Sequence, residues 1–224
     1  MTIRPYRCKR LSATILPNRS QLEGMYETMD RGAEINGPTT SSHTAIPLAP
    51  LPESVAARVQ QAGAPGVNLY RVLAHAPRLL DAWIDFAWAL REQCDTPRRL
   101  RELVILRTAQ CMLSQYEWSQ HRLMAAEAGV DEHQVAELTM WRTSPAFDDA
   151  ERAALALTDA LVEGRVPDEI NATVNEHFGP QARVELTLTA AFYCAVPRLL
   201  DALRVPVEED TSVHGDQEQS EDQN

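Results

Sequence analysis

The residues with the clearest chemical potential are an acid and an imidazole four positions apart, Glu117 and His121, in the run SQYEWSQHRL. Ser114 precedes the acid by three positions, and Glu102 lies in an earlier apolar run. Residues three and four apart share one face of a helix. We therefore expect one hydroxyl, two carboxylates and an imidazole to converge where two helices meet. Histidine titrates near neutral pH, so this set favours proton transfer.

Two predicted helices must position these side chains. The run RELVILRTAQCML, residues 101–113, is apolar on most sides and predicts a buried helix. The second helix is predicted to open at Ser114 and to end at Gly129, because glycine suits the left-handed position after a helix end. No stretch shows the alternation of a β-strand. The sequence therefore predicts an all-α fold with a single helical domain.

Start and stop signals place the other helices. Pro77 suits the first position of a long helix through Arg91, and Thr96 followed by Pro97 predicts the next start. The predicted core side of the helix from Pro77 consists of Leu79, Leu80, Trp83, Phe86, Ala87 and Leu90. The predicted last helix, 181–203, turns Val184, Leu186, Leu188, Ala191, Phe192 and Val196 to the core.

Two capping boxes start further helices. In each, an acid is followed three residues later by Gln or Glu, which pairs Asp131 with Gln134 and Asp148 with Glu151. Gly164 is predicted to end the helix that the second box starts.

Charge is concentrated at the end of the chain. The 224 residues carry a formal net charge of −11, and no Lys or Arg follows Arg204. The sequence predicts an irregular N-terminal extension over 1–46, a helical domain over 47–206 and an acidic, disordered tail over 207–224. There is no basic patch, which argues against a nucleic-acid partner.

The four cysteines lie far apart, at Cys8, Cys94, Cys111 and Cys194, without CxxC spacing. Reduced thiols in the cytoplasm fit this pattern better than a disulfide framework. No run is long and apolar enough to span a bilayer, so no membrane association is expected.

Several separated blocks resemble the carboxymuconolactone decarboxylase family of the alkylhydroperoxidase D-like superfamily. They are NLYRVLAHAPRLLDAW, then RELVILR, YEW with a His three residues later, AxxAGV, and VELTLTAAFYCAVPRLLDALRVP. The resemblance runs from about Pro47 to Pro206. It implies an alkylhydroperoxidase D-like helical bundle, assembly into trimers or hexamers, and substrates that are small unsaturated lactones or enol acids.

In the peroxidase branch of that superfamily a Glu, a CxxC pair and a His form the site. The resemblance puts the Glu at Glu102, the two cysteines at Ser114 and Glu117, and the His at His121. This chain lacks both thiols, so thiol peroxidase chemistry is disfavoured. We expect a cofactor-independent lyase or isomerase in which His121, Glu117 and Glu102 are catalytic.

Five residues are expected to contact the substrate. Arg107 would neutralise a substrate carboxylate, and His75 would approach from another helix. The other three are Ser114, Tyr116 and Trp118. No HExxH or comparable spacing indicates a metal site, and no cofactor is expected.

Structural alternatives exist for each of these residues. Ser114 and Glu117 also form a capping box, and Glu102 has Arg98 and Arg99 at helical distance. His121 also suits a hydrogen-bonded core position. Two other functions stay open: a redox protein that uses Cys111 or Cys194, and a non-catalytic oligomeric binding protein.

Overall fold

The computed structural model describes residues 45–61 and 68–206. Apart from residues 45 and 46, the predicted extension (1–46) and the predicted acidic tail (207–224) lie outside these ranges. Every regular element within the ranges is a helix, which confirms the all-α prediction.

Three helices open the described chain: α2 (Glu53–Gln61), α3 (Asn68–Leu73) and α4 (Pro77–Glu92). Pro77 lies in the first turn of α4, as predicted, where its missing N–H has no helical partner to lose. α2 and α4 share a cluster of buried side chains formed by Val55, Val59, Leu80 and Ile84. Tyr70 of α3 and Trp88 of α4 pack against the same cluster.

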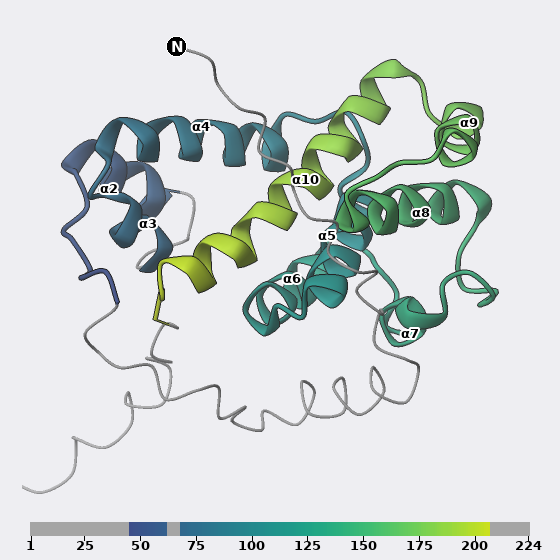
Figure 1. Ribbon diagram of the computed structural model, residues 1–224, viewed down its shortest axis with the longest axis horizontal. Helices are drawn as coiled ribbons and strands as arrows, with labels where there is room; N and C mark the ends of the chain where they lie inside the picture. Colours follow the sequence, from purple (N-terminus) through teal and green to yellow (C-terminus); the bar gives the residue numbers. More distant parts are fainter. Residues whose placement is uncertain (1–44, 62–67, 207–224) are drawn as a thin grey trace, which may run out of the picture. The chain divides into compact units, whose positions relative to one another are not determined.

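The central element is α5 (Arg98–Met112). It packs against α6 (Gln115–Glu127), α8 (Asp149–Glu163) and α10 (Pro180–Ala202) (Figure 1). Helices surround it, so nearly every residue from Leu100 to Gln110 is buried, including the acid Glu102. The prediction of a buried helix here is confirmed.

The turn between α5 and α6 brings the two helices against each other. Leu113 ends α5 in the left-handed conformation, with φ 55°, and Ser114 caps α6. Gly129, with φ 85°, follows α6 as predicted. α5 and α6 thereby pack side by side, and residues from each face the other.

The remaining helices begin and end largely at the predicted signals. Both capping boxes are present, at the starts of α7 (Glu132–Glu137) and α8, and Gly164 ends α8 with φ 83°. α9 (Asp168–His177) follows. Pro197 lies inside α10. A short 3₁₀ helix, Leu138–Met140, continues α7.

The predicted cap at Thr96 is wrong. Pro97 holds the N-cap position, and α5 begins at Arg98. The hydroxyl and the backbone N–H of Thr96 donate instead to the carboxylate of Glu185 on α10, with an N···O distance of 2.7 Å for the N–H. The Thr96 hydroxyl, which was predicted to cap α5, is thus bound to a carboxylate from a distant helix.

The predicted core sides of α4 and α10 are partly wrong. On α4, Leu80, Ile84, Ala87 and Leu90 are buried, whereas Leu79 and Phe86 are exposed. On α10, Leu186 and Val196 are buried, whereas Val184 and Leu188 are exposed. Both helices are apolar on two sides, so hydrophobic periodicity alone did not identify the side that faces the core.

Among the helices of the described ranges, none combines the length and the apolar character needed to cross a bilayer.

Candidate active site

Glu102, Glu117 and His121 meet at the contact between α5 and α6. Nδ1 of His121 lies 2.8 Å from Oε2 of Glu102, and Nε2 lies 3.5 Å from Oε2 of Glu117. Their exposed fractions are 0%, 6% and 5% for Glu102, Glu117 and His121. Three of the four groups predicted to converge are thus together, with the imidazole between two carboxylates, whereas the Ser114 hydroxyl is bonded to the backbone N–H of Glu117.

The electrostatics of Glu102 favour its ionised form. Burial alone would raise the pKa of this carboxyl, but the hydrogen bond and charge of His121 and the charge of Arg98 together lower it below its usual range. Arg98 forms an ion pair with Oε1 across one helical turn. An ionised Glu102 accepts the Nδ1–H of His121, which fixes the ring and leaves Nε2 facing Glu117.

Tyr193 of α10 is the third residue in contact with the imidazole, besides Glu102 and Glu117. Its ring meets the His121 ring edge to face, with centroids 4.7 Å apart and planes at 89°. Burial, followed by the charges of Glu117 and Glu102, raises the pKa of the Tyr193 hydroxyl. That hydroxyl therefore stays protonated and is available as a hydrogen-bond donor next to two acids.

The hydroxyl of Tyr70, on α3, is affected by the charge of Glu117 but not by that of Glu102. Burial is the largest cause that raises the pKa of its hydroxyl, and the charge of Glu117 adds to it. The indole N–H of Trp88 donates a hydrogen bond to this hydroxyl. Neither tyrosine was among the predicted site residues, because each comes from a helix far from α5 and α6 in the sequence. For Tyr193, the FYC block of the family resemblance was the available signal.

Ser114 and Tyr116 lie at the start of α6. The Ser114 hydroxyl accepts a hydrogen bond from the Glu117 N–H at 3.4 Å, so the capping alternative describes its local role. Both residues line a hollow of about 330 Å³ whose other wall is the end of α10, with Pro197 and Leu200. These two predicted contact residues therefore border a hollow that can hold a small molecule.

Two of the other predicted contact residues, Trp118 and His75, have the following contacts. Trp118 packs against a buried cluster that includes Leu103 and Ala125. His75 is exposed, and its Nε2 lies 2.8 Å from the carbonyl oxygen of Pro47. Trp118 thus takes part in core packing, and His75 contacts the segment that precedes α2.

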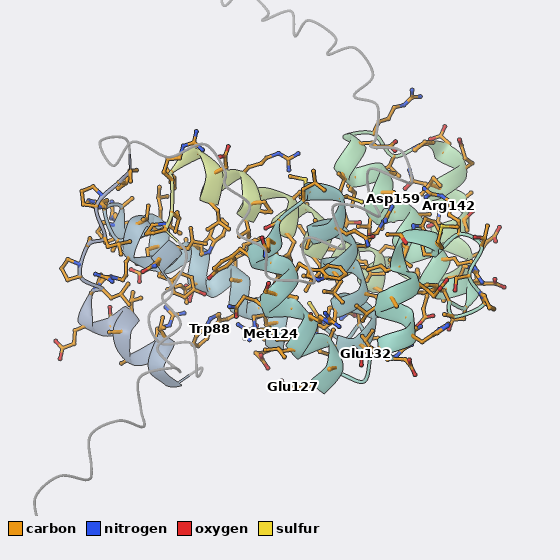
Figure 2. All side chains as sticks on the ribbon, turned by 90° about the horizontal axis from the view of Figure 1, so that it is seen from below. Trp88, Met124, Glu127, Glu132, Arg142 and Asp159 are labelled. Atoms are coloured by element: carbon orange, nitrogen blue, oxygen red, sulfur yellow. The ribbon has the colours of Figure 1, made fainter. Side chains whose placement is uncertain are left out.

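Arg107 is held against α8. Its Nε and one terminal nitrogen donate to Asp159 at 2.6 and 3.1 Å. Arg142 also pairs with Asp159, at 2.7 Å. In Figure 2, Asp159 and Arg142 lie well away from Met124, which is one turn after His121 on α6. The predicted pairing of Arg107 with a substrate carboxylate beside Glu102 therefore does not fit its position.

The thiols of the described region are poorly suited to ionise. Burial first, with the nearby Asp159 carboxylate, raises the pKa of Cys111 to about 12, and the Cys111 thiol lies 3.5 Å from Asp159. Burial also raises the pKa values of Cys94 and Cys194. Thiolates are the reactive form of cysteine, so these surroundings disfavour the redox alternative.

The two carboxylates contact opposite nitrogens of one ring, so they do not converge on a common point. Within residues 45–61 and 68–206, no group of three or more His, Cys, Asp or Glu side chains has the arrangement of a metal site.

Comparison with known proteins gives one family match and one sequence relative. Residues 77–160 match the model of the carboxymuconolactone decarboxylase family. The uncharacterized protein YnjA of Escherichia coli K12 is 28% identical over 123 residues, which are 54% of this chain and 68% of YnjA.

Solved structures with low identity share the fold. A protein of unknown function from Agrobacterium tumefaciens, named as a candidate antioxidant defence protein AhpD, has a TM-score of 0.54 at 23% identity, covering 61% of this chain and 96% of that one. A peroxidase-related protein from Silicibacter sp. TM1040 has a TM-score of 0.63 at 16% identity, and the match covers 76% of this chain and 95% of that one. The debrominase Bmp8 has a TM-score of 0.62 at 19% identity, and the match covers 72% of this chain and 91% of that one. Residues 77–160 thus match the carboxymuconolactone decarboxylase family, and the chain shares the all-helical fold of these solved structures.

Proposed function

We propose that this protein is a cofactor-independent acid–base enzyme, a lyase or isomerase that acts on a small unsaturated lactone or enol acid. The observation that carries the proposal is the buried imidazole of His121, bonded through Nδ1 to Glu102 and facing Glu117 through Nε2. A general acid or base must be oriented and must have a proton partner, and this arrangement supplies both. His121 and Glu117 are the catalytic residues, and Glu102 positions the ring.

In the proposed reaction, the Nε2–Glu117 pair holds or releases one proton. For decarboxylation, the C–C bond to the carboxylate breaks, CO₂ leaves, and the bonding electrons form an enolate. The pair then delivers its proton to carbon and regains one from water. For isomerisation, the same pair removes a proton from one carbon and returns it to another.

A small cyclic substrate suits the volume of the hollow at the start of α6, whose lining does not include His121 or Glu117. The hollow at the start of α6, bordered by Ser114 and Tyr116, measures about 330 Å³. The debrominase with the same fold has been solved in complex with 2,3,4-tribromopyrrole, a compound with one small ring. The family resemblance adds a lactone or enol acid as the chemical class.

His121→Ala and Glu117→Gln test this proposal on a panel of unsaturated carboxylated lactones that includes carboxymuconolactone. We expect each variant to lower kcat/KM by about 10²–10⁴-fold, the usual contribution of general acid–base catalysis. CO₂ release and the loss of ultraviolet absorbance report turnover, and thermal melting reports folding.

Cys111→Ser is the matched control, because it removes the buried thiol from the same helix pair and should retain full turnover. Loss of activity in this control alone would support the redox alternative. A large fall in melting temperature for His121→Ala, in a protein that turns over none of the panel, would contradict the proposal and assign His121 to the core.

We also propose that the chain assembles with copies of itself, as a trimer or hexamer in keeping with the family resemblance. The exposed apolar residues of α4 and α10 support assembly. A cytoplasmic location is proposed as well, since the described cysteines, Cys94, Cys111 and Cys194, are all free thiols.

A further inference from the structure

Two buried polar atoms in the described part of the chain have no hydrogen-bond partner: Nε of Arg91 and Oε1 of Glu102. Oε1 of Glu102 has its charge balanced by Arg98, but outside hydrogen-bond geometry. Buried polar atoms are nearly always paired, so each exception needs a physical explanation. Arg98, which pairs with Glu102, also donates a hydrogen bond to the backbone carbonyl of Arg91 at 3.1 Å, so Arg91 and Glu102 lie around one site.

Arg91 approaches this site from α4. It follows Trp88 by three residues, so the two side chains share a face of the helix. The Trp88 indole is bonded to the hydroxyl of Tyr70, and the charge of Arg91 acts on that hydroxyl and on the hydroxyl of Tyr193.

The two acids of the site and Arg91 lie on different helices. Glu102 and Glu117 accompany the imidazole on α5 and α6. Arg98 is already committed to Glu102 by an ion pair. Arg91 is therefore the cation near both tyrosine hydroxyls whose buried Nε–H still lacks an acceptor. A guanidinium and two phenolic hydroxyls are donors that suit one carboxylate.

We propose that Arg91, with Tyr70 and Tyr193, binds the carboxylate of the substrate and holds the reacting carbon beside Nε2 of His121. This inference rests on the proposed acid–base function and names its specificity-determining residue. It gives Arg91 the role that the sequence suggested for Arg107, whose guanidinium is bound to Asp159. The enzyme should accordingly prefer substrates with a free carboxylate over their neutral amides or esters.

The test measures binding by calorimetry, so it needs no turnover. The probe is crotonate, a small unsaturated carboxylate, and crotonamide is its neutral counterpart. We expect crotonate to bind both the unaltered protein and His121→Ala, and Arg91→Gln to weaken it by at least about tenfold, the effect of losing one charge-assisted contact. Arg78→Gln, which changes an exposed arginine on the same helix, is the matched control and should bind crotonate as the unaltered protein does.

Arg91→Lys and Tyr193→Phe provide the test if Arg91→Gln does not fold. Lysine keeps the charge but loses the forked geometry, so several-fold weaker binding is expected. Failure of crotonate to bind the unaltered protein, or equal binding by the Arg91 variants, would overturn the inference. Loss of crotonate binding in Arg91→Gln with no effect of His121→Ala on turnover would reject the acid–base function while leaving the anion site in place.

Discussion

At the scale of single residues, the site depends on how Glu102 holds the ring of His121. Glu102 is fully buried and bonded to Nδ1, so the imidazole cannot rotate without breaking a charge-assisted hydrogen bond. Tyr193 stacks its edge against the same ring and restricts it from a second direction. Nε2 is thereby directed toward Glu117, where we propose that the proton is exchanged.

Glu102→Gln should destabilise the protein at neutral pH by about 1.5–3 kcal/mol, the usual contribution of a hydrogen bond to a charged group. The pKa of Glu102 is lowered in the folded state, so its stabilising contribution is present above the unfolded value and is lost as pH falls through the folded value. The difference between the two proteins should therefore shrink below about pH 4.3, the ordinary value for Glu. Urea unfolding of the unaltered protein and of Glu102→Gln across this pH range measures this difference in free energy. A difference that does not change with pH would contradict an ionised Glu102.

The sequence predicted the half of the site that lies on neighbouring helices. Spacing on one helix face brought Glu117 and His121 together, and Glu102 lies on the helix immediately before them. Tyr70, Arg91 and Tyr193 were not predicted as site residues. They come from α3, α4 and α10, and only tertiary packing brings such distant segments together, which periodicity does not encode.

At the scale of helices, Glu185 fastens α10 to the start of α5. Its carboxylate accepts from the backbone N–H groups of Asp95 and Thr96 at 3.1 and 2.7 Å, and from Gln181 at 3.0 Å. These N–H groups lie just before the N-terminus of α5, where a negative charge also interacts favourably with the helix dipole. α10 is thus held in the register that brings Tyr193 against His121.

Glu185→Gln should lower the free energy of unfolding by about 1 kcal/mol, the size of a lost helix cap, since the half-exposed carboxylate is partly screened by water. Burial alone would raise the pKa of Glu185, but hydrogen bonds from Thr96 and Gln181 lower it to about 2. Its contribution should therefore disappear as pH falls from about 4.3 toward 2. Glu176→Gln, on an exposed part of α9, is the control and should change the unfolding free energy by less than about 0.5 kcal/mol at any pH.

The sequence predicted where helices begin and end better than it predicted which side of a helix faces the core. The capping boxes at Asp131 and Asp148 and the glycine stop at Gly164 act within a few residues, so the sequence contains the whole signal. Thr96 does not cap α5: its hydroxyl donates to Glu185 of a remote helix, and Pro97 holds the N-cap position. Long-range partners of this kind cannot be read from neighbouring residues.

At the scale of the whole molecule, α4 and α10 share an apolar surface. We define the α4–α10 face by Phe86, Val184, Leu188 and Phe192. Phe86 and Phe192 are in contact, with ring centroids 5.4 Å apart, and Val184 and Leu188 expose 57% and 40% of their surfaces. Continuous apolar surface of this kind usually marks an interface between proteins. We propose that a second copy of the chain covers it.

Leu188→Glu should therefore separate the assembly into smaller species, because a buried, unpaired carboxylate opposes association. Sedimentation velocity or light scattering measures the mass. Leu123→Glu is the matched control, since Leu123 is 71% exposed on α6, apart from the α4–α10 face, and its replacement should leave the mass unchanged. A monomeric mass for the unaltered chain would contradict this interface. So would an oligomeric mass that is the same for the unaltered chain, Leu188→Glu and Leu123→Glu.

The position of Ser114 has an evolutionary consequence. The residue caps α6, where free backbone N–H groups and the helix dipole favour a negative charge, and Glu117 follows one turn later against the imidazole. The family resemblance puts cysteines at these two places in the peroxidase branch, and a thiol there would ionise readily. By this resemblance, two side-chain exchanges at the start of one helix separate thiol chemistry from the proton transfer that we propose. One helical scaffold can then support either chemistry.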